Sequence, residues 1–213
     1  MAIPDFQLGA QWGARARWIS HLIDFWGDPT DELKPPPALA LPDRPEFLVL
    51  EFGATVERPW TTYATAGLSF VPQAGDGPMP YIELMACVPA RDAHAPQLLY
   101  RLARDIALTT ADEPAYKAWD LWRADLFGYR DFALTVPPEP DALLEFPDLA
   151  RRPEDSRYVL AATGTMDAKI FLDLLQVVPL TVDEWLRATT DGLGTVLETI
   201  DWPRCSRTYG WRS

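Results

Sequence analysis

Few side chains in this 213-residue sequence have the types and spacing that metal chemistry requires. Histidine and cysteine bind transition metals most readily, and no two of the four present stand in a C-x-x-C, H-x-x-x-H or E-x-x-H arrangement. Carboxylates alone remain an open alternative for Ca²⁺ or Mg²⁺, but no EF-hand loop pattern occurs. We therefore expect no metal site and no cofactor, and we expect the histidines to be ordinary polar residues. The four side chains are His21, Cys87, His94 and Cys205.

Two short arrangements could supply a nucleophile. Residues 67–71 read Gly-Leu-Ser-Phe-Val, which begins like the G-x-S-x-G elbow of hydrolases but lacks the second glycine and leads into a loop. Cys87 stands seven residues before His94, but no third member of a triad is visible. We therefore predict no catalytic residues and expect that this protein is not an enzyme.

Two glutamates lie inside predicted strands, where acids are uncommon. They are Glu51 and Glu83. If their strands are neighbours and both side chains share a face, each carboxyl group would shift the pKa of the other. For Glu83 we expect a hydrogen-bonded structural acid and no catalytic role.

An acidic segment over residues 131–148 is our candidate for partner binding. It contains five acids and no lysine or arginine, and four prolines stiffen it. Such a segment would attract a basic partner, and the association would weaken as salt rises. A solvated loop without a partner is the alternative. The five acids are Asp131, Glu139, Asp141, Glu145 and Asp148.

Composition and charge indicate an acidic globular protein. The formal net charge of −12 argues against nucleic-acid binding, because phosphate contacts need a basic face. No run approaches the 18 or so apolar residues of a transmembrane helix, and the first residues lack the pattern of a signal peptide. Two isolated cysteines suit a reducing compartment. We therefore expect a cytoplasmic protein without a membrane or nucleic-acid partner.

Hydrophobic periodicity predicts the elements that surround these residues. Residues 14–26 form an amphipathic helix with an aromatic face, and a second helix begins at Pro96 and buries Leu98, Leu99, Leu102 and Ile106. Periodicity does not decide whether residues 170–178 are helix or strand. Strands are predicted over residues 46–52, 60–70, 81–88, 124–136 and 158–162. Alternation in residues 60–70 creates a polar sheet face, which is a second candidate contact surface; it contains Thr61, Tyr63, Thr65 and Ser69.

The clearest helix start lies near the C-terminus. Thr181 and Glu184 match the T-x-x-E capping box, and the apolar face that follows continues to Ile200. Gly192 and Gly194 weaken this helix in its middle. A basic tail, residues 203–213, either folds back onto the acidic body or frays.

Three short pieces, in this order and spacing, resemble the signature of the suppressor-of-fused (SUFU-like) domain family. They are Thr65-Ala66-Gly67-Leu68-Ser69, then Glu83-Leu84 followed by Pro89, then residues 179–184. The resemblance covers about residues 45–200. It implies one SUFU-like domain over residues 1–213, of α/β (α+β) class, with a central mixed, largely antiparallel sheet and three or four packed helices. It also favours a strand in the second half of residues 170–178.

The resemblance further implies a non-catalytic protein-binding function. Eukaryotic members hold a transcription factor between two lobes, and this chain matches only their shared α/β domain. Stand-alone bacterial members are taken, at family level, to be immunity proteins that neutralise a polymorphic toxin. We therefore expect a stoichiometric binder of another protein, with a basic toxin domain as the first candidate. The alternatives are a structural or regulatory subunit unrelated to toxins and, less favoured, an unrecognised enzyme; the oligomeric state stays open.

Overall fold

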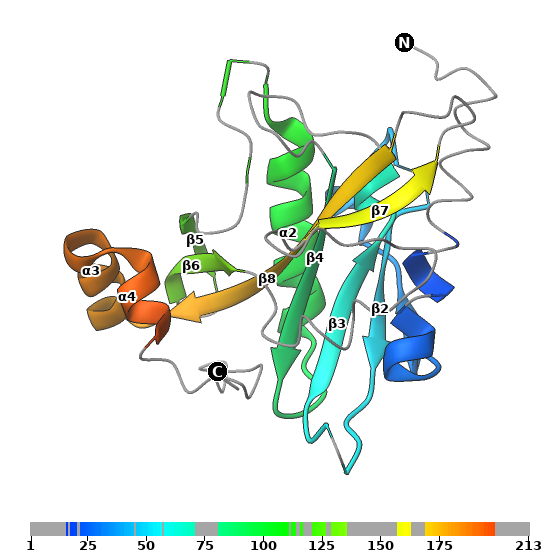
Figure 1. The fold of residues 1–213 in the computed structure, drawn as a ribbon, viewed down its shortest axis with the longest axis horizontal. Coiled ribbons are helices and arrows are strands. Elements are labelled where there is room, and N and C mark those ends of the chain that lie inside the picture. Colours follow the sequence, from blue (N-terminus) through cyan, green and yellow to red (C-terminus); the bar gives the residue numbers. More distant parts are fainter. Residues whose placement is uncertain are drawn as a thin grey trace.

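The fold is built on an eight-stranded sheet in the order β1-β2-β3-β4-β8-β6-β5, with β7 paired to β8 (Figure 1). A computed structural model describes residues 16, 18–20, 22–44, 46–56, 58–70, 81–110, 112–113, 116, 121–126, 129–135, 157–162 and 169–198. The strands are β1 (Asp31–Leu33), β2 (Leu48–Phe52), β3 (Thr61–Ala66), β4 (Tyr81–Val88), β5 (Leu121–Leu126), β6 (Tyr129–Thr135), β7 (Arg157–Ala162) and β8 (Lys169–Leu180). The helices are η1 (Pro37–Leu39), η2 (Leu68–Phe70), α2 (His94–Leu108), α3 (Val182–Asp191) and α4 (Leu193–Glu198), and residues 18–20 and 22–26 are also helical.

The predicted sheet type is confirmed. Every strand pair is antiparallel except β4 with β8, which is parallel, so the sheet is mixed and largely antiparallel. The long strand β8 answers the open question over residues 170–178. Its first half pairs with β4 and β7, and its second half pairs with β6, so β8 joins the two parts of the sheet that Figure 1 separates. Strand partners along its whole length, and not periodicity, decide its type.

Helices cover both faces of β2, β3 and β4. One face packs on α2, whose Leu98, Leu99, Leu102 and Ile106 are buried as predicted. The other face packs on Trp18 and the rest of the N-terminal helical residues. Both side-chain sets of β3 are therefore buried, including Thr61, Tyr63 and Thr65. The predicted polar sheet face is wrong as a contact surface, because a second layer of helix removes it from solvent.

Four local predictions need correction. The first strand is β1, which precedes the range 46–52. The single strand predicted over residues 124–136 is the antiparallel pair β5 and β6. α2 begins at His94, two residues before the predicted start at Pro96. The last helix ends at Gly192, whose φ of 93° turns the chain before α4 begins.

The capping box is confirmed. Thr181 Oγ1 accepts a hydrogen bond from the Glu184 amide at 3.3 Å, and the Glu184 carboxylate accepts one from the Thr181 amide at 2.9 Å. Each side chain thus satisfies an amide that the helix itself leaves without an acceptor. Within the described residues, no helix has the length and apolarity needed to cross a membrane.

Candidate functional site

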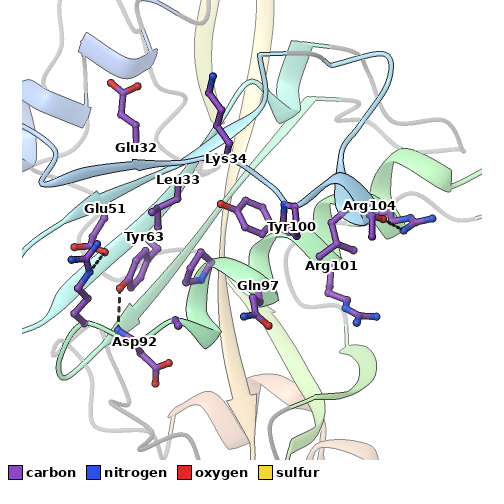
Figure 2. Close-up of a pocket in the computed structure, with 16 residues that line it drawn as sticks. Glu32, Leu33, Lys34, Glu51, Tyr63, Asp92, Gln97, Tyr100, Arg101 and Arg104 are labelled. Carbon is purple, nitrogen blue, oxygen red and sulfur yellow. Dashed lines mark hydrogen bonds and ion pairs between the residues drawn. The ribbon is translucent and has the colours of Figure 1, made fainter.

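An open groove of about 1020 Å³ lies between α2 and the segment that runs from β1 into η1 (Figure 2). Residues of β2 and β3 and the β4–α2 connection also line it. The groove follows from the way α2 packs. Leu98 and Leu102 face the core, while Gln97, Arg101 and Arg104, at helical spacing on the neighbouring side, line the groove.

One end of the groove is an ion-paired cluster around Glu51, which is only 4% exposed. Arg91 Nε donates to Glu51 Oε2 at 3.0 Å, and Arg91 Nη2 donates to Asp31 Oδ2 at 2.5 Å. Thr30 Oγ1 also donates to Glu51 Oε1 at 3.0 Å. β1 and β2 pair Asp31 opposite Glu51, so the register itself brings the two carboxylates to one guanidinium. The carboxylates raise the pKa of Arg91, which stays charged at every pH of interest.

Tyr63 is buried in the floor of the groove beside this cluster. Its hydroxyl oxygen accepts a hydrogen bond from the Asp92 amide at 3.1 Å (Figure 2). Burial, opposed in part by the hydrogen bond from Asp92, raises the pKa of Tyr63 to about 12. The phenol therefore keeps its proton at neutral pH and cannot act as a general base there.

The other end of the groove is cationic. Lys34, Arg101 and Arg104 line it, and Arg104 donates to the carbonyl of Ala38. Lys34 and Arg101 make no ion pair or hydrogen bond within the described residues. Among these cations lies Tyr100, which is 3% exposed.

The Tyr100 hydroxyl has no hydrogen-bond partner within the described part of the chain. Burial, together with the charge of Asp31, raises the pKa of this phenol. The hydroxyl therefore stays protonated at neutral pH and is available to donate. A buried polar group without a partner is uncommon in a native fold and carries a desolvation cost.

A second polar cluster contains the first two pieces of the sequence signature. Glu83 is fully buried in β4, and its Oε1 accepts from the amides of Gly67 and Ser69, both at 3.0 Å, and from the Ser69 hydroxyl at 2.6 Å. Its Oε2 accepts from the Thr65 hydroxyl at 2.6 Å. Arg44, also buried, donates to the Leu68 carbonyl at 2.9 Å. The signature residues therefore meet in space and fix the turn between β3 and η2.

Gly67 is required at this turn. Its φ of 101° is one that residues with a Cβ rarely adopt, and a Cβ there would lie 3.3 Å from both the Glu46 carbonyl oxygen and Phe47 Cα. Burial raises the pKa of Glu83, and the four donated hydrogen bonds oppose that rise. The prediction that Glu83 is a hydrogen-bonded acid is confirmed.

The structure does not bring the other acid and thiol candidates together. β3 separates the strands of Glu51 and Glu83, so the two form no carboxylate pair. Cys87 is buried against the N-terminal helix, whereas His94 begins α2 on the opposite side of the sheet and its Nδ1 lies 3.1 Å from Asp92 Oδ1. Among the described residues, no three His, Cys, Asp or Glu side chains are grouped closely enough to hold a metal ion.

The acidic segment lies mostly outside the described residues. Asp131 belongs to β6, where its backbone pairs with Leu180 of β8. The segment's other four acids, Glu139, Asp141, Glu145 and Asp148, fall outside the described ranges, as do His21, Cys205 and the tail 203–213.

Sequence reasoning singled out only Glu51 and Tyr63 among the polar residues that line the groove. Gln97, Arg101 and Arg104 recur at helical spacing, but charged residues at that spacing usually form a solvated helix face. Tyr100 lies inside this polar stripe, and an aromatic residue there was the one feature that could have indicated a groove. Its lack of a hydrogen-bond partner depends on the β1–η1 segment, which is distant in sequence.

Comparison with known proteins reveals the fold. Neither known family models nor curated protein sequences match this chain significantly. Among solved structures, a SUFU homolog from Neisseria gonorrhoeae FA 1090 matches with a TM-score of 0.56 and 14% identity, over 90% of this chain and 88% of that one. A structure of a Sufu–Fu complex matches with a TM-score of 0.54 and 15% identity, over 87% of this chain and 83% of that one. Drosophila Suppressor of Fused matches with a TM-score of 0.53 and 15% identity, over 85% of this chain and 45% of that one. The chain therefore adopts the SUFU-like fold that its short signature pieces predicted.

Proposed function

We propose that this protein is a non-catalytic protein-binding module, acting in the cytoplasm as a single domain. Its more specific proposed role is that of an immunity-type protein, which neutralises a toxin by binding it stoichiometrically. The SUFU-like fold supports the general proposal, since one matching structure is a complex of Sufu with Fu. The toxin role rests on the resemblance to stand-alone bacterial SUFU-like domains.

The observation that carries the proposal is the chemistry of the groove. Its two tyrosines keep their protons at neutral pH, and Arg91 is ion-paired with Glu51 and Asp31. Of the remaining cations, Lys34 and Arg101 are exposed and unpaired among the described residues, and Arg104 donates to the carbonyl of Ala38. Such groups hold and orient a ligand, whereas general acid–base catalysis needs a group that titrates near neutrality within reach of the reacting atom.

The acidic segment supplies a second proposed contact. Asp131, Glu139, Asp141, Glu145 and Asp148 would steer a basic toxin domain toward the protein through long-range attraction. Replacing Glu139, Asp141 and Glu145 with serine should slow association several-fold at low salt, and the difference should shrink as ionic strength rises. If neither the substitutions nor the salt concentration changed the association rate, this segment would not be part of the interface.

The experiment that tests the function is a stoichiometric titration. Each reading frame encoded beside this gene that resembles a secreted toxin is co-expressed with the chain, and growth rescue identifies the partner. The purified toxin's activity is then measured against added chain. We expect toxin activity to fall linearly and to reach zero at a one-to-one ratio of chain to toxin. We also expect a complex in solution with the mass of one chain plus one toxin. If far less than one equivalent of the chain abolished toxin activity, each chain would be inactivating many toxin molecules, and the non-catalytic proposal would be overturned.

A further inference from the structure

The Tyr100 hydroxyl is the most informative atom in the groove. It is buried and unpartnered within the described residues, and Figure 2 shows it pointing across the groove toward Leu33. Its ring packs edge-on against Phe47 with centroids 6.1 Å apart, so the ring is held in place. A fixed, buried donor without an acceptor among the described residues leaves a hydrogen bond that a ligand in the groove can complete.

The charges nearby specify what that acceptor carries. The chain has a formal charge of −12, yet the end of the groove around Tyr100 presents Lys34, Arg101 and Arg104. Of the acids nearby, Glu51 and Asp31 are paired with Arg91, while Glu32 and Asp92 also line the groove. Hydrogen bonds from cations and from a desolvated hydroxyl are strongest to carboxylates.

The shape of the groove sets the length of the ligand. From Ala93, the residue that precedes α2, to Arg104, the lining residues span about 16 Å along the helix axis. An extended chain of about five residues covers this distance. Leu33, Leu39 and Pro96 add apolar surface beside the charged groups. Because side chains alternate along an extended chain, such a segment can present carboxylates to the cations and apolar side chains to this surface.

We propose that this groove binds an extended acidic segment of the partner protein, in which separate carboxylates pair with Lys34 and Arg101 and an acceptor of the segment takes the hydrogen bond from Tyr100. The inference rests on the proposed protein-binding function and names the chemistry of the segment that is bound. It is independent of the acidic segment 131–148, whose proposed partner surface is basic.

The test uses the full chain and a fluorescent, end-blocked pentapeptide of sequence Glu-Leu-Glu-Leu-Glu. Binding is followed by fluorescence polarisation, with Lys-Leu-Lys-Leu-Lys as the charge-reversed probe. We expect the acidic probe to bind and the basic probe to fail. Tyr100→Phe should raise the dissociation constant about tenfold, because the hydrogen bond from the Tyr100 hydroxyl is lost. Lys34→Glu combined with Arg101→Glu should abolish binding and remove its salt dependence.

The controls separate the groove from general effects of charge and folding. Arg187 is an exposed cation on α3, outside the groove, so Arg187→Glu should leave the dissociation constant unchanged. Tyr100→Phe should melt at the same temperature as the parent or higher, since it deletes an unsatisfied polar atom. A folded Tyr100→Phe variant with unaltered affinity would overturn the proposal, as would equal binding of both probes or no binding at millimolar peptide.

Two further measurements distinguish the neighbouring alternatives. Inorganic phosphate that binds in a Tyr100-dependent manner, while the peptide does not, would identify a small-anion site and overturn the peptide proposal. The toxin partner identified by growth rescue should also bind the Lys34→Glu, Arg101→Glu variant more weakly. Unchanged partner affinity would refute the groove as the contact and leave stoichiometric binding intact. Peptide binding without any protein partner would refute the proposed function alone.

Discussion

Glu83 and Ser69 are joined twice: the same carboxylate oxygen, Oε1, accepts the Ser69 amide at 3.0 Å and the Ser69 hydroxyl at 2.6 Å. The hydroxyl of Thr65 and the amide of Gly67 complete the set of four donors. One buried side chain in β4 therefore holds the end of β3 and the turn that follows. A position that looks like a candidate acid in the sequence is the anchor of a loop in the fold.

Replacement of Glu83 should reveal this anchor. Glu83→Gln retains one acceptor oxygen, and the Thr65 hydroxyl can turn to accept from the new amide, so we expect a moderate loss of about 1–3 kcal/mol. Glu83→Leu removes the acceptor of all four hydrogen bonds and should cost several kcal/mol more. Urea unfolding of both variants checks this. Equal losses would show that packing, and not hydrogen bonding, sets the cost. Binding activity should survive Glu83→Gln.

The pH dependence of stability tests the protonation of Glu83. Burial raises the pKa of this carboxyl group in the folded state, so the folded protein binds the proton more tightly than the unfolded chain does. The stability that Glu83 contributes should therefore decrease as pH rises from the ordinary glutamate pKa of about 4.3 through the higher folded value. The measurement is the difference in unfolding free energy between the parent and Glu83→Gln across this range. A difference that grows with pH would mean that the four donors outweigh burial.

Alanine at two glycines should have opposite effects. Gly67→Ala should destabilise the protein by about 2 kcal/mol, because alanine is strained at positive φ and its Cβ would crowd Phe47. Gly194 lies in α4, and a Cβ added there would meet no atom within 4 Å, so Gly194→Ala should stabilise by about 0.5–1 kcal/mol. Thermal unfolding of the pair provides the check, and a shift of the same sign in both would contradict the backbone argument.

The two groove tyrosines give a second matched pair. Tyr63→Phe removes the acceptor of the Asp92 amide and should cost about 1 kcal/mol. Tyr100→Phe makes the same chemical change where no partner exists in the described structure, so stability should stay constant or rise. Denaturant midpoints report both effects. A larger loss at Tyr100 than at Tyr63 would show that its hydroxyl already has a partner in the free protein.

The capping box is tested most simply. Thr181→Ala should destabilise by about 1 kcal/mol, since the Glu184 amide loses its acceptor. Thr189 lies in the same helix, is exposed, and bonds only to the Leu186 carbonyl within the described structure. Thr189→Ala is therefore the control and should change the denaturant midpoint little. An unchanged midpoint for Thr181→Ala would show that the cap contributes nothing to global stability.

Elements whose signals are local could be predicted from the amino-acid sequence. In β4, aliphatic residues stand at every second position, and α2 carries its apolar stripe at helical spacing. Thr181 and Glu184 form a cap within one helical turn. The order of the short signature pieces was also sufficient to predict a SUFU-like fold with a mixed, largely antiparallel sheet. Each of these depends on residues close together along the chain or on their order.

Which surfaces stay accessible to a partner depends on tertiary packing. The polar alternation in β3 predicted an exposed face, but helices packed on both sides of the sheet bury it. One strand was predicted over residues 124–136, whereas the chain forms the antiparallel pair β5 and β6, whose pairing is a tertiary contact. The groove exists because β1 and η1 lie across from α2, about 60 residues away along the chain, and leave Tyr100 buried without a partner in the described structure. Burial and hydrogen-bond satisfaction depend on such distant contacts, and no local pattern encodes them.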